Sequence, residues 1–478
     1  MKSYTLRMAQ SHFDRLMAHL FPGDGDEHGA VVAAGLVETA DGICLLAREV
    51  FLARDGIDYV PGNTGYRALT TDFVARVSGY CAKAKLAYFA VHCHGGSDAV
   101  AFSEIDLQSQ RRGYPALLDI VGGPPVGALV FANNAVAGQV WTRDGVIELG
   151  SMTVIGKRHR RLYPSRRKAP RFVDALYDRQ ALMFGSAGQE LLGAAKVGII
   201  GLGGAGSLIS EWLSLAGVGT IVGIDFDRME VSNRARVVGA TRWDTLEWLA
   251  RSRWPWLQNF ARRHSTHKVT VARRVARRAN PDIVYHAVVG DVRIAETALL
   301  LKDCDFMFLC ADSAQCRLVF NALVHQYLIP GAQVGSKVPV DRETREVGDV
   351  FIAARPVFPM VGGGCLRCNN LIPPAQLQRE AISVEERRRQ AYVDDPQVVA
   401  PSVITLNAEC CSQATNDFLM GFLGLTHDNA RGGYLMQFCR ERLWMSVDCR
   451  AEATCPHCGG SATSVYARGD AADLPCKS

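Results

Sequence analysis

Four closely spaced glycines are the first residues in this chain whose types and spacing point to chemistry. They follow an apolar run and precede a helical pattern, and they are Gly201, Gly203, Gly204 and Gly206. Such a loop lets backbone N–H groups approach a phosphate, and the start of the next helix adds partial positive charge. We therefore predict a nucleotide-binding βαβ unit, with strands over 197–200 and 220–224 and a helix over 207–216.

The polar residues after the second strand distinguish this unit from that of a dehydrogenase. A dinucleotide needs one acidic residue there for its ribose. Here Asp225 and Asp227 alternate, and Asn233 and Arg236 follow. Because an arginine and an amide lie so near the phosphate loop, the pattern favours a ligand with more charge than a dinucleotide, such as ATP.

One residue further along extends the same predicted site. Asp312 follows a predicted buried strand over 306–310. Since a carboxylate at the carboxyl end of a parallel strand faces the ligand crevice, we expect Asp312 to lie beside the glycine loop.

A second group of residues in the first third of the chain has the character of a metal site. His92 and His94 end a predicted strand over 86–94. Side chains two residues apart in a strand point to the same face, so both imidazoles can bind one ion. With Asp106 as a third ligand, a zinc ion would keep a position open for water, which is typical of a catalytic site.

A water bound to that zinc would need a base. Glu27, just before the first predicted strand of this region, is our candidate, and Glu38 and Glu49 are the alternatives. Ser103 lies three residues before Asp106, where a loop opens a helix.

Two CxxC pairs near the end of the chain predict a third, structural site. Together they form a closed tetrahedral zinc site without an open position, and they are Cys365, Cys368, Cys455 and Cys458. His457 lies inside the second pair, and we do not expect it to be a ligand.

Length and composition set the frame in which these sites lie. The chain has 478 residues, a net charge of +5 and 48% hydrophobic residues, which is typical of soluble multidomain proteins. Fifteen cysteines, an odd number that includes the CxxC pairs, favour a reducing cytoplasm. No apolar run reaches the length of roughly 18 residues that a membrane span needs, so we expect no membrane contact.

The elements that must position these residues suggest an α/β protein of two domains. We predict an α+β domain over 1–155, a basic linker over 156–172, a Rossmann-like domain over 173–467 and a disordered tail over 468–478. The basic run in the linker favours a solvated segment over a contact with nucleic acid. A tryptophan-rich stretch after Arg236 predicts a helical insertion with core or interface packing.

The motifs of the second domain resemble those of E1-like (ThiF-type) adenylation domains. The resemblance rests on GxGGxGS from Gly201 and on DxDxxExSNxxR from Asp225. It implies ATP with its ribose near Asp225, Mg²⁺ at Asp312, and Lys268 and Arg236 against the phosphates. It also implies that Asn233 orients the α-phosphate.

The segment before the nucleotide loop carries a further part of this resemblance. Tyr177-Asp178-Arg179-Gln180 resembles the start of such domains. In that family the corresponding arginine reaches the phosphates of the neighbouring subunit, so the resemblance implies a homodimer.

The first domain resembles the JAMM (JAB/MPN) metalloproteases, which have an upstream glutamate followed by HxH and SxxD. The resemblance implies that His92, His94 and Asp106 bind zinc, that Glu27 is the general base and that Ser103 helps to hold the oxyanion. In this chain Cys93 replaces the usual small hydroxyl residue between the histidines, and Gly95 replaces the usual proline after them.

The two resemblances together imply a cytoplasmic fusion enzyme. The second domain would adenylate the C-terminal carboxylate of a ubiquitin-like protein, with an E2-like acceptor and a role in bacterial antiphage defence as further implications. The first domain would trim or remove that modifier. The alternatives are activation of a sulfur-carrier protein beside a non-catalytic docking domain, and adenylation of a small carboxylate.

Overall fold

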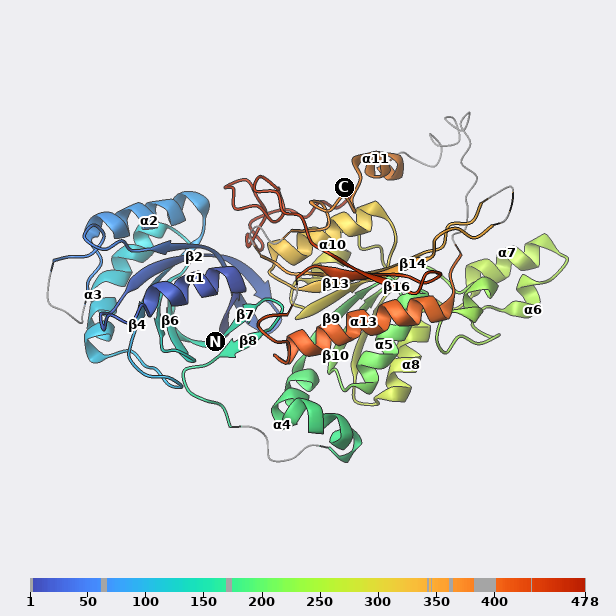
Figure 1. Cartoon of the computed structure of the whole chain (residues 1–478), viewed down its shortest axis with the longest axis horizontal. Helices are drawn as coiled ribbons and strands as arrows, with labels where there is room; N and C mark the ends of the chain where they lie inside the picture. Colours follow the sequence, from blue (N-terminus) through green and yellow to red (C-terminus); the bar gives the residue numbers. More distant parts are fainter. Residues whose placement is uncertain are drawn as a thin grey trace.

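A computed structural model describes two sheet-based units joined side by side (Figure 1). It describes residues 3–61, 67–168, 174–341, 344, 346–360, 364–381, 401–430 and 432–477. The predicted division into an N-terminal α+β unit and a C-terminal α/β unit matches the two separate sheets.

The N-terminal unit is built on one strongly curved sheet. Its strands are β1 (Ser3–Ala9), β2 (Gly29–Thr39), β3 (Gly42–Leu52), β4 (Ala87–Cys93), β5 (Val126–Phe131), β6 (Val136–Thr142), β7 (Gly145–Ile155) and β8 (Arg160–Leu162). They lie in the order β1-β3-β2-β4-β5-β6-β7-β8, and β1 also pairs with β7. This extra pairing closes the sheet on itself and removes two exposed edges.

Three helices cover this sheet, namely α1 (Gln10–Leu20), α2 (Thr71–Ala84) and α3 (Glu104–Val121). α1 packs with the residues inside the curve of the sheet, and α2 and α3 pack against the outer face. The Thr70 side chain accepts a hydrogen bond from Phe73 N and caps α2. The predicted strand over 86–94 corresponds to β4, but we did not predict β1 and α1.

The C-terminal unit has a second eight-stranded sheet. Its strands are β9 (Lys196–Ile200), β10 (Thr220–Ile224), β11 (Val284–Val288), β12 (Phe306–Leu309), β13 (Gly331–Lys337), β14 (Phe351–Val357), β15 (Tyr434–Phe438) and β16 (Leu443–Val447). The order is β11-β10-β9-β12-β13-β14-β15-β16, with the first five strands parallel and the last three antiparallel. The order reverses between β9 and β12, where a ligand crevice is expected.

Helices cover both faces of this sheet. The helices described in this unit are α4 (Asp178–Ala194), α5 (Gly204–Leu215), α6 (Glu247–Ala250), α7 (Pro255–His264), α8 (Lys268–Ala279), α9 (Ala295–Ala298), α10 (Ala314–Gln326), α11 (Pro374–Ala381) and α13 (Ile404–Phe422), with 3-10 turns at Ala175–Tyr177, Val231–Ala235 and Leu299–Leu301. Buried residues of α5, α8 and α13 pack together on one face, and those of α10 pack on the other. The predicted Rossmann-like architecture is therefore present.

The tryptophan-rich stretch forms the helices α6 and α7, as predicted, but its tryptophans are not core residues. Its four indole side chains are exposed, and they belong to Trp243, Trp248, Trp254 and Trp256. Periodicity alone did not show that residues 241–264, which we call the excursion, lie away from the sheet. They lie at the end of the molecule opposite the N-terminal unit (Figure 1).

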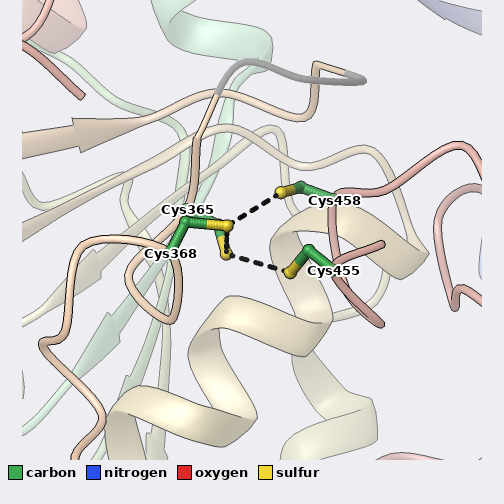
Figure 2. A group of neighbouring side chains, drawn as sticks. All are labelled: Cys365, Cys368, Cys455 and Cys458. Carbon is green, nitrogen blue, oxygen red and sulfur yellow. Dashed lines mark hydrogen bonds between the residues drawn. The ribbon is translucent and has the colours of Figure 1, made fainter. Parts of the chain in front are cut away.

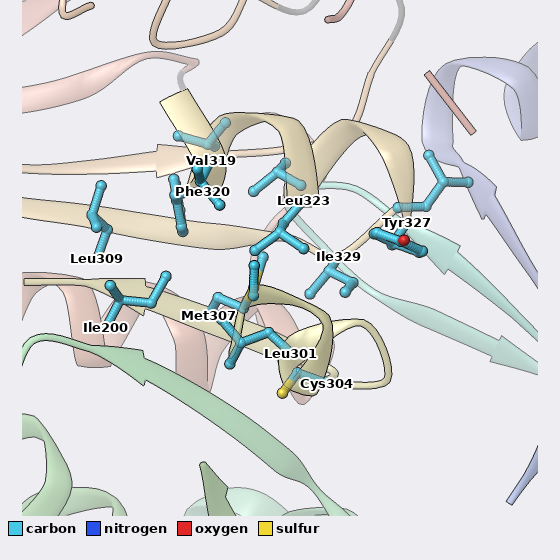
Figure 3. Packing of buried hydrophobic residues seen from close by; sticks show 14 of the residues in the cluster. Ile200, Leu301, Cys304, Met307, Leu309, Val319, Phe320, Leu323, Tyr327 and Ile329 are labelled. Carbon is cyan, nitrogen blue, oxygen red and sulfur yellow. The ribbon is translucent and has the colours of Figure 1, made fainter. Parts of the chain in front are cut away.

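One hydrophobic core continues across the two units. It joins Val37 and Leu46 of the N-terminal sheet to Phe320 and Leu323 of α10 and to residues of β9, β10 and β12. Figure 3 shows the part of this core between the second sheet and α10, where Met307 and Leu309 meet Phe320. Because both units contribute fully buried side chains, they fold as one packed body.

The segment that we predicted as a solvated basic linker belongs in part to this packed body. Residues 160–162 form β8, and the Arg161 guanidinium donates a hydrogen bond to Phe422 O. His159 is buried, and its N–H bonds to Gly421 O. The prediction missed this because basic residues bury their stems while their charged ends bond backbone carbonyls. Residues 169–172 of the predicted linker lie outside the described residues.

The predicted disordered tail is also wrong for residues 468–477, which contact both units. Asp470 N donates to Leu36 O, and Asp470 Oδ2 accepts from Glu38 N at 2.9 Å. Gly35 permits this approach, because a Cβ there would lie 2.1 Å from Ala467 O. Further along, Lys477 N donates to Arg293 O of the C-terminal unit. Small polar residues suggested disorder, but these contact partners lie far away in the sequence.

Buried His159 makes the stability of this junction depend on pH. Burial, together with the charges of Arg161 and Arg7, lowers the pKa of His159 to about 3. The unfolded chain therefore binds the proton at a higher pH than the folded chain does. As the pH falls from 6.5 towards the folded pKa, we expect the free energy of unfolding to fall by up to about 1.4 kcal/mol per pH unit. His159→Phe should make the free energy of unfolding depend less on pH in this range, which urea titrations from pH 7 to pH 4 would measure. An unchanged slope would contradict the assignment.

Among the described residues, no helix is both long and apolar enough to span a bilayer.

Candidate functional site

A pocket of about 230 Å³ lies at the switch point of the second sheet, between the ends of β9, β10, β11 and β12. The predicted residues among those that line it are Gly201, Gly203, Asp225, Asp227, Lys268 and Asp312. A larger hollow of about 760 Å³ lies between α13 and the β14–β16 part of the sheet. Because it lies away from the motif residues, we assign the chemistry to the smaller pocket.

The glycine loop places the start of α5 beside the pocket. Gly201 has a φ of +88°, a conformation that side chains rarely adopt. A Cβ on Gly206 would lie 1.9 Å from Gly201 O, and a Cβ on Gly204 would lie 2.5 Å from the Asn407 side-chain amide. Gly201 and Gly203 line the pocket, whereas Gly206 allows α5 to pack closely against the end of β9 and Gly204 leaves room for Asn407 of α13.

Asp225, Asp227 and Lys268 form a connected charged group at the pocket. Asp225 accepts hydrogen bonds from Leu202 N and Asp227 N, each at 2.8 Å. The Lys268 ammonium lies 2.5 Å from Asp227 Oδ2 and 4.0 Å from Asp225 Oδ2. Burial raises the pKa of Asp225, although Lys268 and the two N–H groups oppose that shift. Lys268 thus lies at the pocket, as predicted, with its charge held by two carboxylates.

Asp312 and a pair that we did not predict complete the pocket wall. Asp312 lies just after β12 and is exposed to the pocket. After β11, the Arg293 guanidinium lies 2.6 Å from Asp291 Oδ2, and both residues line the pocket. The signal for this pair was available, because residues after β11 end at the same edge of the sheet as Asp225.

Three residues that the resemblance assigned to ATP lie outside the lining of this pocket. Asn233 is buried, and its side chain accepts a hydrogen bond from Glu230 N, so it organises the turn Val231–Ala235. Arg236 does not line the pocket, and its Cβ lies 3.6 Å from the place that a Cβ on Gly204 would take. Arg179 is exposed on α4. The sequence could not show this, because motif spacing does not fix where a long side chain ends.

The predicted metal-binding side chains of the N-terminal unit come together. One ligand atom from each of His92, His94 and Asp106 lies within 4.8 Å of the others. Each histidine Nε2 lies 3.4 Å from an oxygen of Asp106. His92 Nε2 is buried without a hydrogen-bond partner, and His94 Nδ1 bonds to Ala101 O at 3.1 Å. An orphaned imidazole nitrogen beside a carboxylate fits a metal ion.

Glu27 is the candidate base that lies beside this group. Its Oε1 is 3.9 Å from His94 Nε2. The strand register explains this, because Gly29, two residues later, pairs directly with His92. Of the alternatives, Glu49 bonds to Tyr80 Oη at 2.7 Å, and Glu38 lies near the other end of β2.

Ser103 has a structural role in this arrangement. It caps α3 in a capping box with Asp106, and its Oγ lies 2.7 Å from Asp106 Oδ2. Contacts with His92 and Ser103 outweigh the effect of partial burial and hold the pKa of Asp106 well below its usual range. Ser103 therefore orients a carboxylate oxygen, and the predicted oxyanion contact stays a prediction.

The four predicted zinc cysteines form a buried cluster (Figure 2). Cys365 Sγ lies 3.7 Å from both Cys368 Sγ and Cys455 Sγ, and Cys368 Sγ lies 3.6 Å from Cys458 Sγ. These separations are close to those between the sulfurs of one tetrahedral zinc ion. The four thiols fit such an ion, with no position left open.

A buried amide on α10 fixes the cluster to the rest of the unit. Asn321 accepts a hydrogen bond from Leu366 N and contacts His457 Nδ1 at 3.0 Å. The His457 ring therefore contacts Asn321 and does not belong to the cysteine group, as predicted.

One family model matches a segment of the second unit. Residues 177–387 match the ThiF family. The range holds the whole nucleotide pocket and two of the four clustered cysteines, and it excludes the N-terminal unit. The resemblance of this segment to E1-like adenylation domains is thus confirmed at the level of the family.

Individual relatives match parts of the chain. The molybdopterin-synthase adenylyltransferase of Escherichia coli is 34% identical over 148 residues, which cover 30% of this chain and 52% of that protein. The adenylyltransferase and sulfurtransferase uba4 of Emericella nidulans is 32% identical over 205 residues, 41% of this chain and 37% of that protein. The sulfur carrier protein ThiS adenylyltransferase of Bacillus subtilis is 31% identical over 165 residues, 34% and 44% of the two chains. The chain spans about half or less of the length of these relatives.

Among solved structures, the Microcin C7 biosynthetic enzyme MccB in complex with N-formylated MccA is 15% identical, with a TM-score of 0.45. That match covers 90% of this chain and all of that one.

Proposed function

We propose that this protein adenylates the C-terminal carboxylate of a sulfur-carrier or ubiquitin-like protein. The observation that carries the proposal is the ThiF-family pocket, in which a glycine loop and a helix N-terminus face Lys268, Arg293 and Asp312. Such a pocket combines phosphate-binding groups with a carboxylate suited to a divalent cation.

The step that these groups would serve is a displacement at phosphorus. A carboxylate oxygen of the bound protein attacks the α-phosphorus of ATP, the bond to the β-phosphate bridging oxygen breaks, and pyrophosphate leaves. Mg²⁺ bound with the help of Asp312 would neutralise charge on the phosphates. Lys268 and Arg293 hold positive charge at the pocket, so positioning and electrostatics supply the rate enhancement.

An arginine from a second copy would add to this charge. Arg179 is exposed on α4 and lies outside the pocket lining of its own chain. We include a homodimer in the proposal, in which Arg179 acts on the partner's nucleotide. An E2-like acceptor and a role in antiphage defence stay predictions.

The relatives favour a sulfur-carrier protein as the substrate, because they include enzymes named for molybdopterin synthase and for the sulfur carrier protein ThiS. The test is ATP–pyrophosphate exchange with B. subtilis ThiS and with small β-grasp proteins encoded beside the gene. Exchange that requires a free C-terminal carboxylate would support the proposal. Exchange stimulated by free amino acids but by no protein would favour a small-carboxylate adenylase.

A metal-dependent peptidase is a second candidate function, located in the N-terminal unit. The observation that favours it is the convergence of His92, His94, Asp106 and Glu27, with His92 Nε2 left without a hydrogen-bond partner. Zinc at this site would activate a water molecule. Glu27 would take the proton of that water, and the histidines and Asp106 would hold the ion beside the substrate.

Zinc content separates a metal-binding N-terminal unit from a docking unit. We expect two zinc ions per chain in the purified protein, and one in His92→Gln/Asp106→Asn, because this change removes two ligands of one site only. Elemental analysis would measure the content, and pyrophosphate exchange should persist in the variant. The matched control is His19→Gln, which changes an imidazole that bonds to Gly29 O outside the group. One zinc per chain in the wild type would contradict the prediction.

A further inference from the structure

The excursion over residues 241–264 carries a cluster of exposed aromatic side chains that the proposed reaction does not use. The exposed fractions of its tryptophans are 75%, 49%, 51% and 65% for Trp243, Trp248, Trp254 and Trp256. Phe260 on α7 is exposed by 47%. Single exposed apolar residues are ordinary, but five exposed aromatic side chains within one short segment, two of them in contact, favour an interaction surface. We call these five residues the aromatic platform.

Buried ion pairs hold the base of the platform. Arg274 bonds both oxygens of buried Asp244, at 2.8 and 2.7 Å. Glu247, also buried, pairs with Arg234 and lies 3.0 Å from Arg251. The backbone that carries the tryptophans is thus already ordered, so binding of a partner would cost less conformational entropy.

Both ends of the excursion are fixed at the nucleotide pocket. Arg228 and His267 form a β-bridge, and Met229 N donates to Thr266 O at 2.8 Å. Lys268 N donates to Asp227 O at 3.1 Å, between two residues that line the pocket. A partner on the platform would therefore be held by the same body that holds the nucleotide.

The charge around the platform is positive. Residues 241–264 contain five arginines and two carboxylates, and both carboxylates are buried in the ion pairs of the base. Arg253, Arg262 and Arg263 are exposed. Tryptophan and arginine together are the side chains that most often carry binding energy in protein interfaces.

We propose that the aromatic platform docks a polypeptide segment in which acidic residues stand beside apolar ones. The apolar side chains would pack on the exposed indole rings, and the carboxylates would pair with Arg253, Arg262 and Arg263. This surface belongs to a protein partner and is distinct from the pocket that binds the nucleotide.

Two other occupants fit the surface less well. A second copy of the chain meeting it across a two-fold axis would oppose arginines to arginines. Single-stranded nucleic acid stacks its bases on free ring faces. Here Trp243 and Trp248 pack against each other with centroids 4.7 Å apart, and the Arg253 guanidinium lies over the Trp254 ring at 5.0 Å.

Selection from random 12-residue peptides displayed on phage tests the proposal without any assumption about adenylation. The bait is the full chain, and counter-selection uses Trp243→Ser/Trp256→Ser. We expect enriched peptides to combine Asp or Glu with apolar residues. Their synthetic forms should bind the double variant at least about 10-fold more weakly, because the loss of central aromatic contacts costs more than about 1.4 kcal/mol.

Two further variants make the result specific. Arg262→Glu/Arg263→Glu should weaken the same peptides and reduce the salt dependence of binding, whereas Trp444→Ser, at an exposed tryptophan on β16, should leave binding unchanged. Melting temperatures would establish that all variants fold. No enrichment over the double variant, or enrichment of basic peptides, would overturn the proposal. So would tryptophan-dependent binding of oligothymidylate or tryptophan-dependent self-association in sedimentation velocity.

Discussion

Asp312→Asn should lower the rate of protein-dependent ATP–pyrophosphate exchange by roughly 100-fold or more, while the protein stays folded. The side chain keeps its size but loses the charge that would bind the cation opposite the phosphates, and one such electrostatic contact is worth about 2.7–4 kcal/mol in a transition state. Asp312 lies just after β12 and is exposed to the pocket, so its replacement disturbs no buried contact. Initial rates at saturating ATP and Mg²⁺ would measure the effect.

The matched control for this variant lies at the other end of the same sheet. Asp282 is an exposed carboxylate just before β11, outside the pocket. Asp282→Asn makes the same chemical change, and we expect it to leave exchange within about twofold of the wild type, as for surface substitutions in general. Equal activity of the Asp312→Asn and wild-type proteins would contradict the assigned role of Asp312.

Cys455→Ser should cause the largest loss of stability of any single substitution considered for this chain. Structural zinc sites contribute apparent binding energies of about 10–16 kcal/mol, comparable with the total stability of a folded domain. Loss of one thiolate should release the ion and unfold the loops that Asn321 attaches to α10. We expect one zinc fewer per chain and a melting temperature lower by more than about 10 °C, to be measured by elemental analysis and calorimetry.

Cys449→Ser is the control for this change. Cys449 is exposed, close in sequence to the second CxxC pair and outside the four-cysteine group. Its substitution should alter neither the zinc content nor the melting temperature. A Cys455→Ser protein that kept both at the wild-type values would show that the cluster does not bind zinc.

Local patterns predicted the parts of this protein that depend on neighbours in sequence. The glycine loop, the two strands around it and the paired histidines lie where periodicity and spacing indicated. The contribution of Arg293 to the pocket was missed because it has no motif of its own, although its place after β11 was an available signal. Side-chain reach was also not predictable, since Asn233 turns into its own loop and Arg236 lies behind the glycines.

Contacts between residues far apart in the sequence were the other part of the structure that we could not predict. β1 is a short strand at the chain start, and only its pairing with both β3 and β7 gives it a role. Residues 468–477 were expected to be disordered, yet Asp470 bonds to β2, more than 400 positions earlier, and Lys477 bonds to Arg293 of the C-terminal unit. Neither contact leaves a trace in local periodicity.

The continuous core between the two units also bears on how the chain is made. Val37 and Leu46 belong to a sheet that is synthesised first, but Phe320 and Tyr466, which pack in the same core, emerge much later. At about 5–20 residues per second, the ribosome takes roughly 15–60 s to advance from the end of the first sheet to Tyr466. During that interval an apolar face of the nascent N-terminal sheet stays exposed to solvent. We therefore expect chaperones that bind nascent chains at the ribosomal exit to bind this face.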